Sequence, residues 1–511
     1  MSNGNSRAID YDVVIVGAGI SGISFAYRLQ QTNPNLSYAI IESRHEIGGT
    51  WSLFKYPGTP KSTKPPPNST SLTITFNLGI RSDSDLYTFS FPWKPWTKGQ
   101  AIAEGALIQE YLHEAVEEQG IAPHIKFNRK VRAMDWSSNT NTWTFDIIGE
   151  DKKQKQLRSR FVCLGSGYYD YDEPLKAVIP GIDQFQGPVI HPQFWPQDFD
   201  YTDKNVVIIG SGATAVTLLP SMTDKAAHVT MLQRSPSWII PVKNRSGGLE
   251  ALMQRWLPTQ LGSALVRFRR TLLSFLFVRY CLWRPASARK LLLGATEKQL
   301  PAGTDMAPDF VPAYDPWSQR LCATPDADFY QALRAGRASV ATGRIATVTE
   351  SSIKLTSGAE LHPDVIVTAT GLKTTVGGNA RIAVDGAPAH IPDLYAWKGA
   401  MLEGLPNLFF AFGYVDASWT PGADATAQLA GRMIRQLDRE GKQALIPTRT
   451  AREKATMQDV PFMRLTSTYV KSGLSNLPKT GDAKQWLPRS YYFKDVMNAW
   501  WGDIRSSIEW R

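Results

Sequence analysis

Two glycine-rich turns carry the clearest chemistry in this 511-residue chain. The first, Gly17-Ala18-Gly19-Ile20-Ser21-Gly22, follows an apolar run at residues 11–16 and opens an apolar helical pattern. A G-x-G-x-x-G turn between a buried strand and a helix lets a pyrophosphate meet the free N–H groups of the helix N-terminus. A second apolar run, residues 36–41, ends in Glu42, whose carboxylate suits a ribose hydroxyl and disfavours a 2′-phosphate. The pattern therefore predicts a site for FAD or NAD that includes Gly17, Gly19, Gly22 and Glu42.

The pattern occurs a second time, after the apolar run at residues 205–209. The turn there reads Gly210-Ser211-Gly212-Ala213-Thr214-Ala215, and the next strand ends in Arg234-Ser235 where the first unit has an acid. A guanidinium and a hydroxyl at that place suit a 2′-phosphate. Two such units predict two dinucleotides, which we assign as FAD in the first unit and NADPH in the second.

The composition excludes several classes of protein. With 43% hydrophobic and 20% charged residues, the chain is typical of a folded globular protein. Three widely spaced cysteines, Cys163, Cys281 and Cys322, offer no redox-active pair, disulfide scaffold or metal-ligand spacing, so a disulfide reductase and a metal site are not expected. No apolar run reaches the roughly 20 residues of a membrane span, and no signal-peptide pattern occurs, so we expect a cytoplasmic protein with at most peripheral membrane contact.

The two turns also predict the architecture. We expect an α/β fold with two Rossmann-like domains, the NADPH domain being inserted into the FAD domain, because strand-to-glycine segments at residues 161–167 and 365–371 look like crossing points. The expected boundaries are 1–165 for the first part of the FAD domain, 166–345 for the NADPH domain and 346–511 for the second part of the FAD domain with C-terminal helices. A helical subdomain is expected at about 245–315.

The net charge of +10 is concentrated in that subdomain. Residues 249–302 hold nine basic and two acidic side chains, a net of +7, among runs of Leu, Phe and Trp. One interpretation is a helical cover over a substrate pocket with a solvated basic face, which we favour. The other is a helix that lies on a membrane surface. Interleaved basic and aromatic residues can also bind nucleic acid, but no recognised module supports such a partner.

One segment resembles the fingerprint of Baeyer–Villiger monooxygenases. Residues 185–196 match F-x-G-x-x-x-H-x-x-x-W-P at every specified position, with His191 and Trp195 among them. The resemblance implies a linker between the domains, in which His191 positions them and is not a catalytic base. Related enzymes that oxidise nitrogen and sulfur typically carry Tyr or Phe in place of Trp195.

A second family pattern, G-x-W-x-x-x-x-Y-P-G-x-x-x-D, is interrupted. It begins at Gly49 and Trp51 and continues through Tyr56-Pro57-Gly58, but Ser62 stands where the acid belongs. Residues 59–79 contain eight Ser or Thr, four Pro and no acid, and their removal completes the pattern with Asp83. We therefore interpret 59–79 as an insertion, and two origins stay open: a genuine loop extension or the translation of a retained intron.

Outside this insertion the chain resembles the ethionamide-monooxygenase-like subgroup of that family over nearly its whole length. The resemblance implies that one arginine lies over the flavin, where a cation stabilises the negative charge that oxygen activation develops. By its place in the segment Asp315-Pro316-Trp317-Ser318-Gln319-Arg320, that arginine is Arg320, with Asp83 nearby. A lysine common in relatives before the arginine is Gln319 here, which leaves more of the NADPH preference to Arg234. The cofactor contacts that the resemblance implies are Ser21, Thr50, Trp51, Ser52, Leu53, Asp83, Val131 and Trp419 for FAD, and Arg81, Ser82 and Gly210 to Val216 for NADP, the last run comprising Gly210, Ser211, Gly212, Ala213, Thr214, Ala215 and Val216.

These features predict an FAD-dependent, NADPH-consuming monooxygenase. The expected reaction inserts one oxygen atom of O2 next to a ketone carbonyl to give an ester or lactone, with a small-molecule ketone as substrate and a place in secondary-metabolite (polyketide) biosynthesis. Two alternatives stay open: oxygenation of sulfur or nitrogen in a thioether, thioamide or amine on the same scaffold, and an inactive flavoprotein disabled by the 59–79 insertion.

Overall fold

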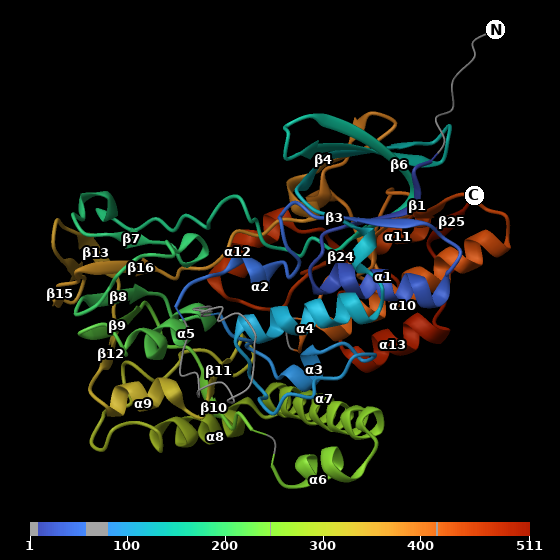
Figure 1. The fold of residues 1–511 in the computed structure, drawn as a ribbon. Coiled ribbons are helices and arrows are strands. Elements are labelled where there is room, and N and C mark those ends of the chain that lie inside the picture. The colour runs from blue at the N-terminus through green and yellow to red at the C-terminus, as the bar shows by residue number, and fades with distance from the viewer. Residues whose placement is uncertain (1–8, 58–79, 246, 415–416) are drawn as a thin grey trace, which may run out of the picture.

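The computed structural model describes residues 9–57, 80–245, 247–414 and 417–511, so the expected insertion at 59–79 lies outside the described residues. Two sheets organise this part of the chain, and Figure 1 shows the strands around β1 and β6 on one side of the molecule and those around β8 and β16 on the other. The first sheet has eleven strands, which come from residues 11–164 and 381–410.

The core of the first sheet is parallel. In it β1 pairs with β2 on one side and with β6 on the other, and β21 extends β6. β1 forms because its residues from Val13 onwards are apolar and buried, as a strand covered on both faces requires. Its strands are β1 (Tyr11–Val16), β2 (Tyr38–Ile41), β3 (Ile125–Lys126), β4 (Arg129–Ser137), β5 (Thr142–Gly149), β6 (Gln154–Leu164), β17 (Arg381–Val384), β18 (Ala387–Pro388), β19 (Ala396–Trp397), β20 (Met401–Leu402) and β21 (Leu408–Phe410).

The second sheet is built from the middle of the chain. Its five strands are all parallel and run in the order β12-β9-β8-β16-β7. They are β7 (Val189–Ile190), β8 (Asn205–Ile209), β9 (His228–Gln233), β12 (Ala338–Thr342) and β16 (Val365–Thr368). The helices α5 (Ala213–Met222) and α9 (Asp328–Arg334) belong to the same unit and contact each other.

The nested arrangement predicted from the two turns is confirmed. The chain leaves the first sheet after β6, builds the second sheet, and returns to the first sheet with β17, which pairs with β4. The strand β16 pairs with β8 over four residues, so it belongs to the second unit. We accordingly move the boundary that we propose for the second unit from residue 345 to a point after Thr368.

The two ends of the chain are held together by a helix pair beneath the first sheet. α1 (Ile20–Thr32) packs along α10 (Trp419–Arg439), and Figure 1 shows the blue and orange helices side by side. The Arg28 guanidinium donates to both carboxylate oxygens of Asp424, at 2.7 and 2.9 Å, and the Asp424 side chain is fully buried. This charge pair therefore fixes the C-terminal part of the unit on the helix that follows the first glycine turn.

Three consecutive helices fill the range in which a helical subdomain was expected. They are α6 (Leu249–Trp256), α7 (Thr259–Trp283) and α8 (Pro285–Glu297), and they form the lower end of the molecule in Figure 1. α7 contacts both neighbours and also α3 (Leu86–Phe89) of the first unit. In the part of the chain that the structure covers, no helix is long and apolar enough to cross a membrane.

Short elements complete the fold. The pair β10 (Ile239–Val242) and β11 (Cys322–Pro325) flanks the helical subdomain, and β13 (Ile345–Val348), β14 (Ile353–Leu355) and β15 (Glu360–Leu361) form a small antiparallel sheet. Around the first sheet lie α2 (Thr50–Leu53), α4 (Gly105–Glu118), α11 (Ala451–Thr456), α12 (Thr468–Gly473) and α13 (Tyr492–Trp501), with the strand pairs β22 (Leu445–Pro447) with β25 (Ile508–Trp510) and β23 (Asp459–Val460) with β24 (Thr480–Gly481).

Candidate functional site

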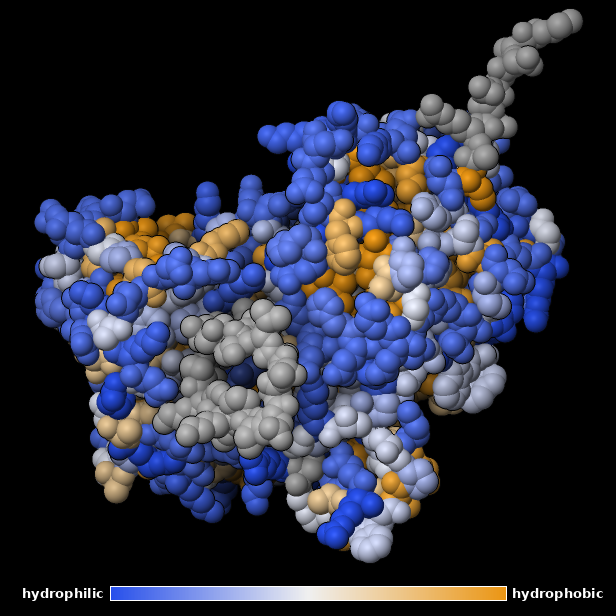
Figure 2. Space-filling model, in the orientation of Figure 1, coloured by the Kyte–Doolittle hydropathy of each residue, from blue (hydrophilic) through white to orange (hydrophobic). Residues whose placement is uncertain are grey.

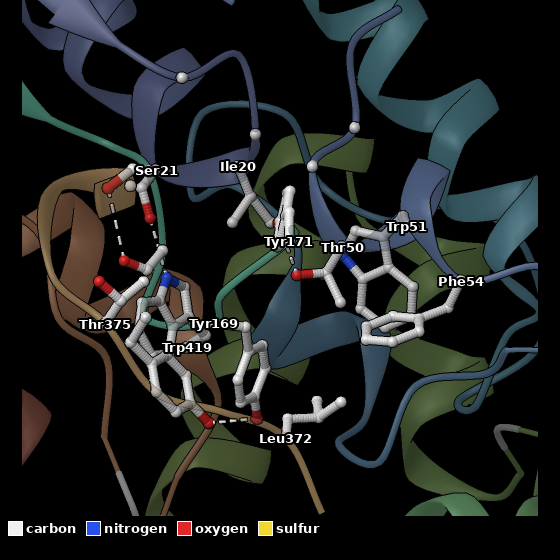
Figure 3. Close-up of a pocket in the computed structure, with 18 of the residues that line it drawn as sticks. Ile20, Ser21, Thr50, Trp51, Phe54, Tyr169, Tyr171, Leu372, Thr375 and Trp419 are labelled. Atoms are coloured by element: carbon white, nitrogen blue, oxygen red, sulfur yellow. Dashed lines mark hydrogen bonds between the residues drawn. The ribbon is translucent and has the colours of Figure 1, made fainter. Parts of the chain in front are cut away.

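A cavity of about 310 Å³, called here the first cavity, lies where the two units meet. Its wall includes the first glycine turn, the end of β2, α2 and the N-terminus of α5, so both dinucleotide units contribute to it. Figure 3 shows Ser21, Thr50, Trp51 and Trp419 around this space. The predicted residues that line it are Gly17, Gly19, Ser21, Glu42, Thr50, Trp51, Arg81, Asp83, Val131, Ala213, Thr214, Arg320 and Trp419.

The glycines of the first turn are packed closely against neighbouring backbone atoms. A Cβ built on Gly22 would lie 1.8 Å from the Gly17 carbonyl oxygen, so Gly22 serves the close packing of turn and helix and does not line the cavity. Gly17 has a φ of +98°, which a side chain would disfavour. Gly19 caps α1 with extended backbone, and within the described chain no side chain bonds the cap. These helix N–H groups, facing a cavity, fit a pyrophosphate.

Glu42 has a structural role in addition to the expected contact with a ribose hydroxyl. Its side chain is buried, with Oε2 accepting from the Ala18 N–H at 2.6 Å and Oε1 accepting from the Arg44 N–H at 2.9 Å. It therefore holds the glycine turn on the end of β2. Each carboxylate oxygen can accept more than one hydrogen bond, so a ribose hydroxyl remains a chemically suitable partner.

Three aromatic residues that the sequence analysis missed shape the same cavity. Tyr168, Tyr169 and Tyr171 follow the Gly165-Ser166-Gly167 turn after β6 and line the cavity. The Tyr171 hydroxyl lies 3.2 Å from Thr50 Oγ1, and burial raises the pKa of Tyr171 to about 12, so the phenol stays neutral at pH 7. The signal was available, because these tyrosines directly follow a segment that the sequence marks as a crossing point.

Trp419 closes the cavity from the C-terminal part of the chain. Its Nε1 donates to Ser21 Oγ at 2.8 Å, and its ring stacks on Tyr168 with centroids 5.0 Å apart. Ser52 and Leu53, by contrast, do not line the cavity: Ser52 Oγ donates to the Gly49 carbonyl inside α2, and Leu53 packs against the hydrophobic cluster of the second unit.

The second glycine turn is open. A Cβ on Gly210 would lie 2.2 Å from the Ala369 carbonyl oxygen, so this glycine serves close packing, but a Cβ on Gly212 would meet nothing within 4 Å. Gly212 and Ala213 are exposed, and Ala213 and Thr214 line the first cavity. Ala215 and Val216 are buried inside α5, and Arg234, Ser235 and Ser211 lie outside the cavity lining, the first two exposed after β9.

The segment after the expected insertion joins the two units. The Arg81 guanidinium is nearly buried and forms an ion pair with Asp328 at the start of α9. Ser82 bonds to Ala103 through both its N–H, which donates at 2.9 Å, and its Oγ, which accepts at 3.2 Å. Ser82 is thus a buried structural residue away from the cavity lining, whereas Arg81 lines the cavity with its guanidinium already paired.

Arg320 and Asp83 meet at one wall of this cavity. Arg320 Nη2 lies 3.1 Å from Asp83 Oδ2, and both side chains are partly exposed. They also line a second cavity of about 420 Å³, whose other walls come from α7, β10, β11 and the start of α13. The lining of that second cavity includes Phe275, Phe277, Val278 and Phe493 together with several charged side chains. A charge pair therefore stands between a cavity walled by both glycine turns' units and a second cavity walled in part by aromatic rings, an arrangement suited to a cofactor on one side and an organic substrate on the other.

His191 lies at the edge of the first cavity, after β7. Its Nδ1 accepts from the Gln193 N–H at 3.2 Å, and burial lowers the pKa of the ring, although the Gly371 backbone opposes that shift. The ring is therefore neutral at pH 7. Its location beside the residues that follow β16 is compatible with positioning the second unit, which stays a prediction.

The three cysteines do not form a redox pair. Cys163, Cys281 and Cys322 are all free thiols with buried side chains. Burial raises the pKa of Cys322 to about 12 and that of Cys281 to about 11. Among the described residues no group of His, Cys, Asp or Glu could hold a metal ion.

Comparison with known proteins agrees with this geometry. The family model described as pyridine nucleotide-disulphide oxidoreductase matches residues 14–263. The chain is 42% identical over 486 residues to the FAD-containing monooxygenase EthA of Mycobacterium tuberculosis strain H37Rv, covering 95% of this chain and 94% of that one. It is 38% identical over 485 residues to the probable FAD-binding monooxygenase AlmA of Acinetobacter baylyi, covering 95% and 92%.

Solved structures have the same fold. OTEMO in complex with FAD and NADP superposes with a TM-score of 0.72 at 19% identity, covering 99% of this chain and 100% of that one. Cyclohexanone monooxygenase with bound ε-caprolactone gives a TM-score of 0.71 at 19% identity, covering 98% and 99%. The predicted monooxygenase class and the predicted cofactors agree with these findings. From its identity to EthA and AlmA over 95% of its length, the chain belongs to the family of FAD-containing, class B flavin monooxygenases.

Proposed function

We propose that the chain inserts one oxygen atom of O2 next to a ketone carbonyl, giving an ester or lactone, at the wall shared by the two cavities. The observation that carries this proposal is the Arg320–Asp83 pair, which lines both cavities at once. In this proposal the first cavity holds the cofactors and the second holds the ketone.

The residues present fit FAD and NADPH. For FAD, the first turn offers an uncapped helix N-terminus, Glu42 lies at the end of β2, and Trp419 closes the space over Ser21. For NADPH, the open turn at Gly212 and the exposed pair Arg234 and Ser235 follow the ends of β8 and β9. When bound, reduced flavin supplies activated oxygen and NADPH supplies the hydride.

The chain's own residues then stabilise charge and exclude water. The Arg320 guanidinium is a permanent cation, and in a cavity shielded from water it stabilises a negatively charged oxygen more than solvent would. Asp83 holds that guanidinium through the 3.1 Å contact and so fixes its direction. We propose these two as the catalytic residues, with Arg320 stabilising the charge and Asp83 orienting it.

A second candidate function is oxygenation of sulfur or nitrogen on the same scaffold. The 42% identity to EthA favours it, given the resemblance to the ethionamide-monooxygenase-like subgroup. The two reactions depend to different extents on the positive charge of Arg320. A ketone needs an anionic, nucleophilic oxygen, whereas a thioether needs a neutral, electrophilic one, so a nearby cation assists the first reaction more than the second.

The deciding experiment compares matched substrates. The purified flavoprotein is incubated with NADPH in air, once with an aliphatic methyl ketone and once with the thioether of equal chain length, and products are quantified by gas chromatography. Ester formed from the ketone supports the proposal. Sulfoxide formed without any ester supports the second candidate. A purified protein that is colourless, and so holds no flavin, and that does not oxidise NADPH contradicts both candidates.

A further inference from the structure

The outward side of the helical subdomain exposes large apolar side chains. One set of them is called the α7 face here and comprises Leu261, Leu265, Phe268, Leu276 and Trp283 on α7 with Leu252 and Trp256 on α6; Leu249, Leu273 and Leu282 are exposed as well. The two tryptophans are each 73% exposed and Phe268 is 56% exposed. Figure 2 shows orange and white side chains among blue ones over these helices at the lower end of the molecule.

The α7 face is a true helix face. Successive members on α7 are separated by four, three, eight and seven residues, which places them on one side of the helix. The opposite side carries the buried residues Val266, Val278 and Cys281 and packs against the protein. The exposed side of α7 therefore carries large apolar side chains in addition to the exposed Arg279, and the solvated basic face that we expected over the subdomain stays a prediction.

Basic side chains surround this apolar surface. Arg255, Arg279, Arg284 and Lys290 are exposed, and Arg284 and Arg255 lie 4.4 and 5.6 Å from the ring centroids of Trp283 and Trp256. Of the two acids in residues 249–302, Glu250 is buried and paired with Arg269 and Arg270. The exposed charge of the subdomain is therefore strongly positive.

We propose that the α7 face docks on an anionic lipid surface. Phospholipid acyl chains would cover the leucines and tryptophans, while the headgroup phosphates would meet the arginines and lysine, as amphipathic helices rich in Arg and Trp do at membrane interfaces. A second copy of the chain on the same face would bring two positive surfaces together and so lacks charge complementarity. α7 would lie along the surface, since it is not a membrane span.

The α7 face borders the second cavity. Arg279 and Leu282 are exposed and at the same time line that cavity, and Tyr491 does so from the segment before α13. If the second cavity takes the substrate, as the proposed function states, its entrance is at the membrane side. The substrate class is then a lipophilic ketone or thioether that partitions into lipid.

A site-specific fluorophore tests the docking without turnover. The three native thiols are buried, and burial raises their pKa values, so a single introduced cysteine is labelled selectively. Leu276→Cys carries an environment-sensitive dye on the α7 face, and Val178→Cys, at a residue 97% exposed elsewhere, is the matched control. Vesicles of phosphatidylcholine with 30% phosphatidylglycerol, about a third anionic lipid, are expected to shift the emission of the first label to the blue and to leave the second unchanged.

Two variants separate the apolar and the ionic contributions. Leu276→Glu and Arg284→Glu are each expected to weaken binding to anionic vesicles about tenfold, because each removes a favourable contact and adds a repelled charge. Neither residue lines either cavity, so NADPH oxidation with a short, water-soluble substrate should stay as in the parent protein. A protein without monooxygenase activity that still binds the vesicles would leave the docking in place and refute only the proposed function.

Three outcomes would overturn the docking proposal. One is no spectral shift with anionic vesicles. Another is equal binding to neutral phosphatidylcholine with no weakening by salt. The third is a dimer in light scattering that Leu276→Glu converts to a monomer, which would show that a second copy covers the α7 face.

Discussion

The two glycine turns have nearly the same sequence pattern but different surroundings. The first is enclosed: Glu42 holds it from β2, Trp419 bonds Ser21 from α10, and a Cβ at Gly19 would lie 3.6 Å from the Gly49 Cα. The second is open: Gly212 faces free space, and Arg234 lies exposed at the end of β9. The difference teaches that one motif can be closed by distant parts of the chain in one unit and left open in the other.

The enclosure of the first turn depends on parts of the chain that are distant in sequence. Trp419 and Asp424 lie on α10, some 400 residues after Ser21 and Arg28, to which they bond. The second turn has neighbours in its own unit, such as Ser237, whose Oγ lies 2.9 Å from Ser211 Oγ, and one in the first unit, Tyr56, which bonds Thr214. The first turn is thus held by side chains about 400 positions away in the sequence, whereas Ser211 of the second turn bonds within its own unit.

The largest effect is expected at the first turn. Gly22→Ala places a methyl group 1.8 Å from the Gly17 carbonyl oxygen, and backbone cannot yield as a side chain can. We expect a loss of about 3 kcal/mol in the free energy of unfolding, as overpacking at its upper range costs, together with loss of bound flavin. The flavin content is measured by the ratio of the absorbance at about 450 nm, from flavin, to that at about 280 nm, from protein. The loss of stability is measured by thermal unfolding. A variant that retains full flavin would show that the turn is less enclosed than the contacts indicate.

The second-largest effect is expected at Arg320, in the cavity wall where the two units meet. Arg320→Ala removes the cation but no contact of the first turn, so flavin content should match the parent protein while ester yield falls about 10² to 10³-fold. NADPH consumption should continue, with oxygen reduced to hydrogen peroxide. Arg320→Lys is the matched control and should retain part of the yield. Ester formation at the parental level in Arg320→Ala would remove this residue from the mechanism.

The sequence predicted the two turns, their order and the nesting, because these depend on local strand–turn–helix patterns. It also placed Arg320 and Asp83 together through their motifs, although 237 positions separate them. It failed where packing decides. Ser52 and Ser82 belong to matching motifs, but their side chains bond to nearby backbone groups and do not line the cavity. Tyr168 and Tyr171 were missed although they follow a segment marked as a crossing point, and they line the cavity because β6 ends beside β1. For residues 249–302 the sequence left open a helical cover and a membrane-surface helix, because composition does not show which side of a helix the protein covers.

A smaller effect is expected at the end of β9. Arg234→Ala should raise KM for NADPH about 10- to 100-fold and leave KM for NADH nearly unchanged, because hydrogen bonds to a charged phosphate are worth about 1.5 to 3 kcal/mol. Arg381→Ala, an exposed arginine of the first unit, is the control and should change neither value. Equal increases for the two nucleotides would mean that the 2′-phosphate is bound elsewhere.

The smallest effect is expected at the open turn and completes the comparison. Gly212→Ala adds the same methyl group as Gly22→Ala, but at the second glycine of its motif, the position that Gly19 holds in the first turn, and no atom lies within 4 Å of it. Flavin content and thermal stability should therefore equal those of the parent protein. KM for NADPH should rise less than about fivefold, since the methyl stands where a pyrophosphate approaches the N-terminus of α5 and costs about 1 kcal/mol of binding. A loss of flavin or of stability comparable to that of Gly22→Ala would mean that the second turn is as closely packed at Gly212 as the first turn is at Gly22, and the contrast between an enclosed and an open turn would then have no structural basis.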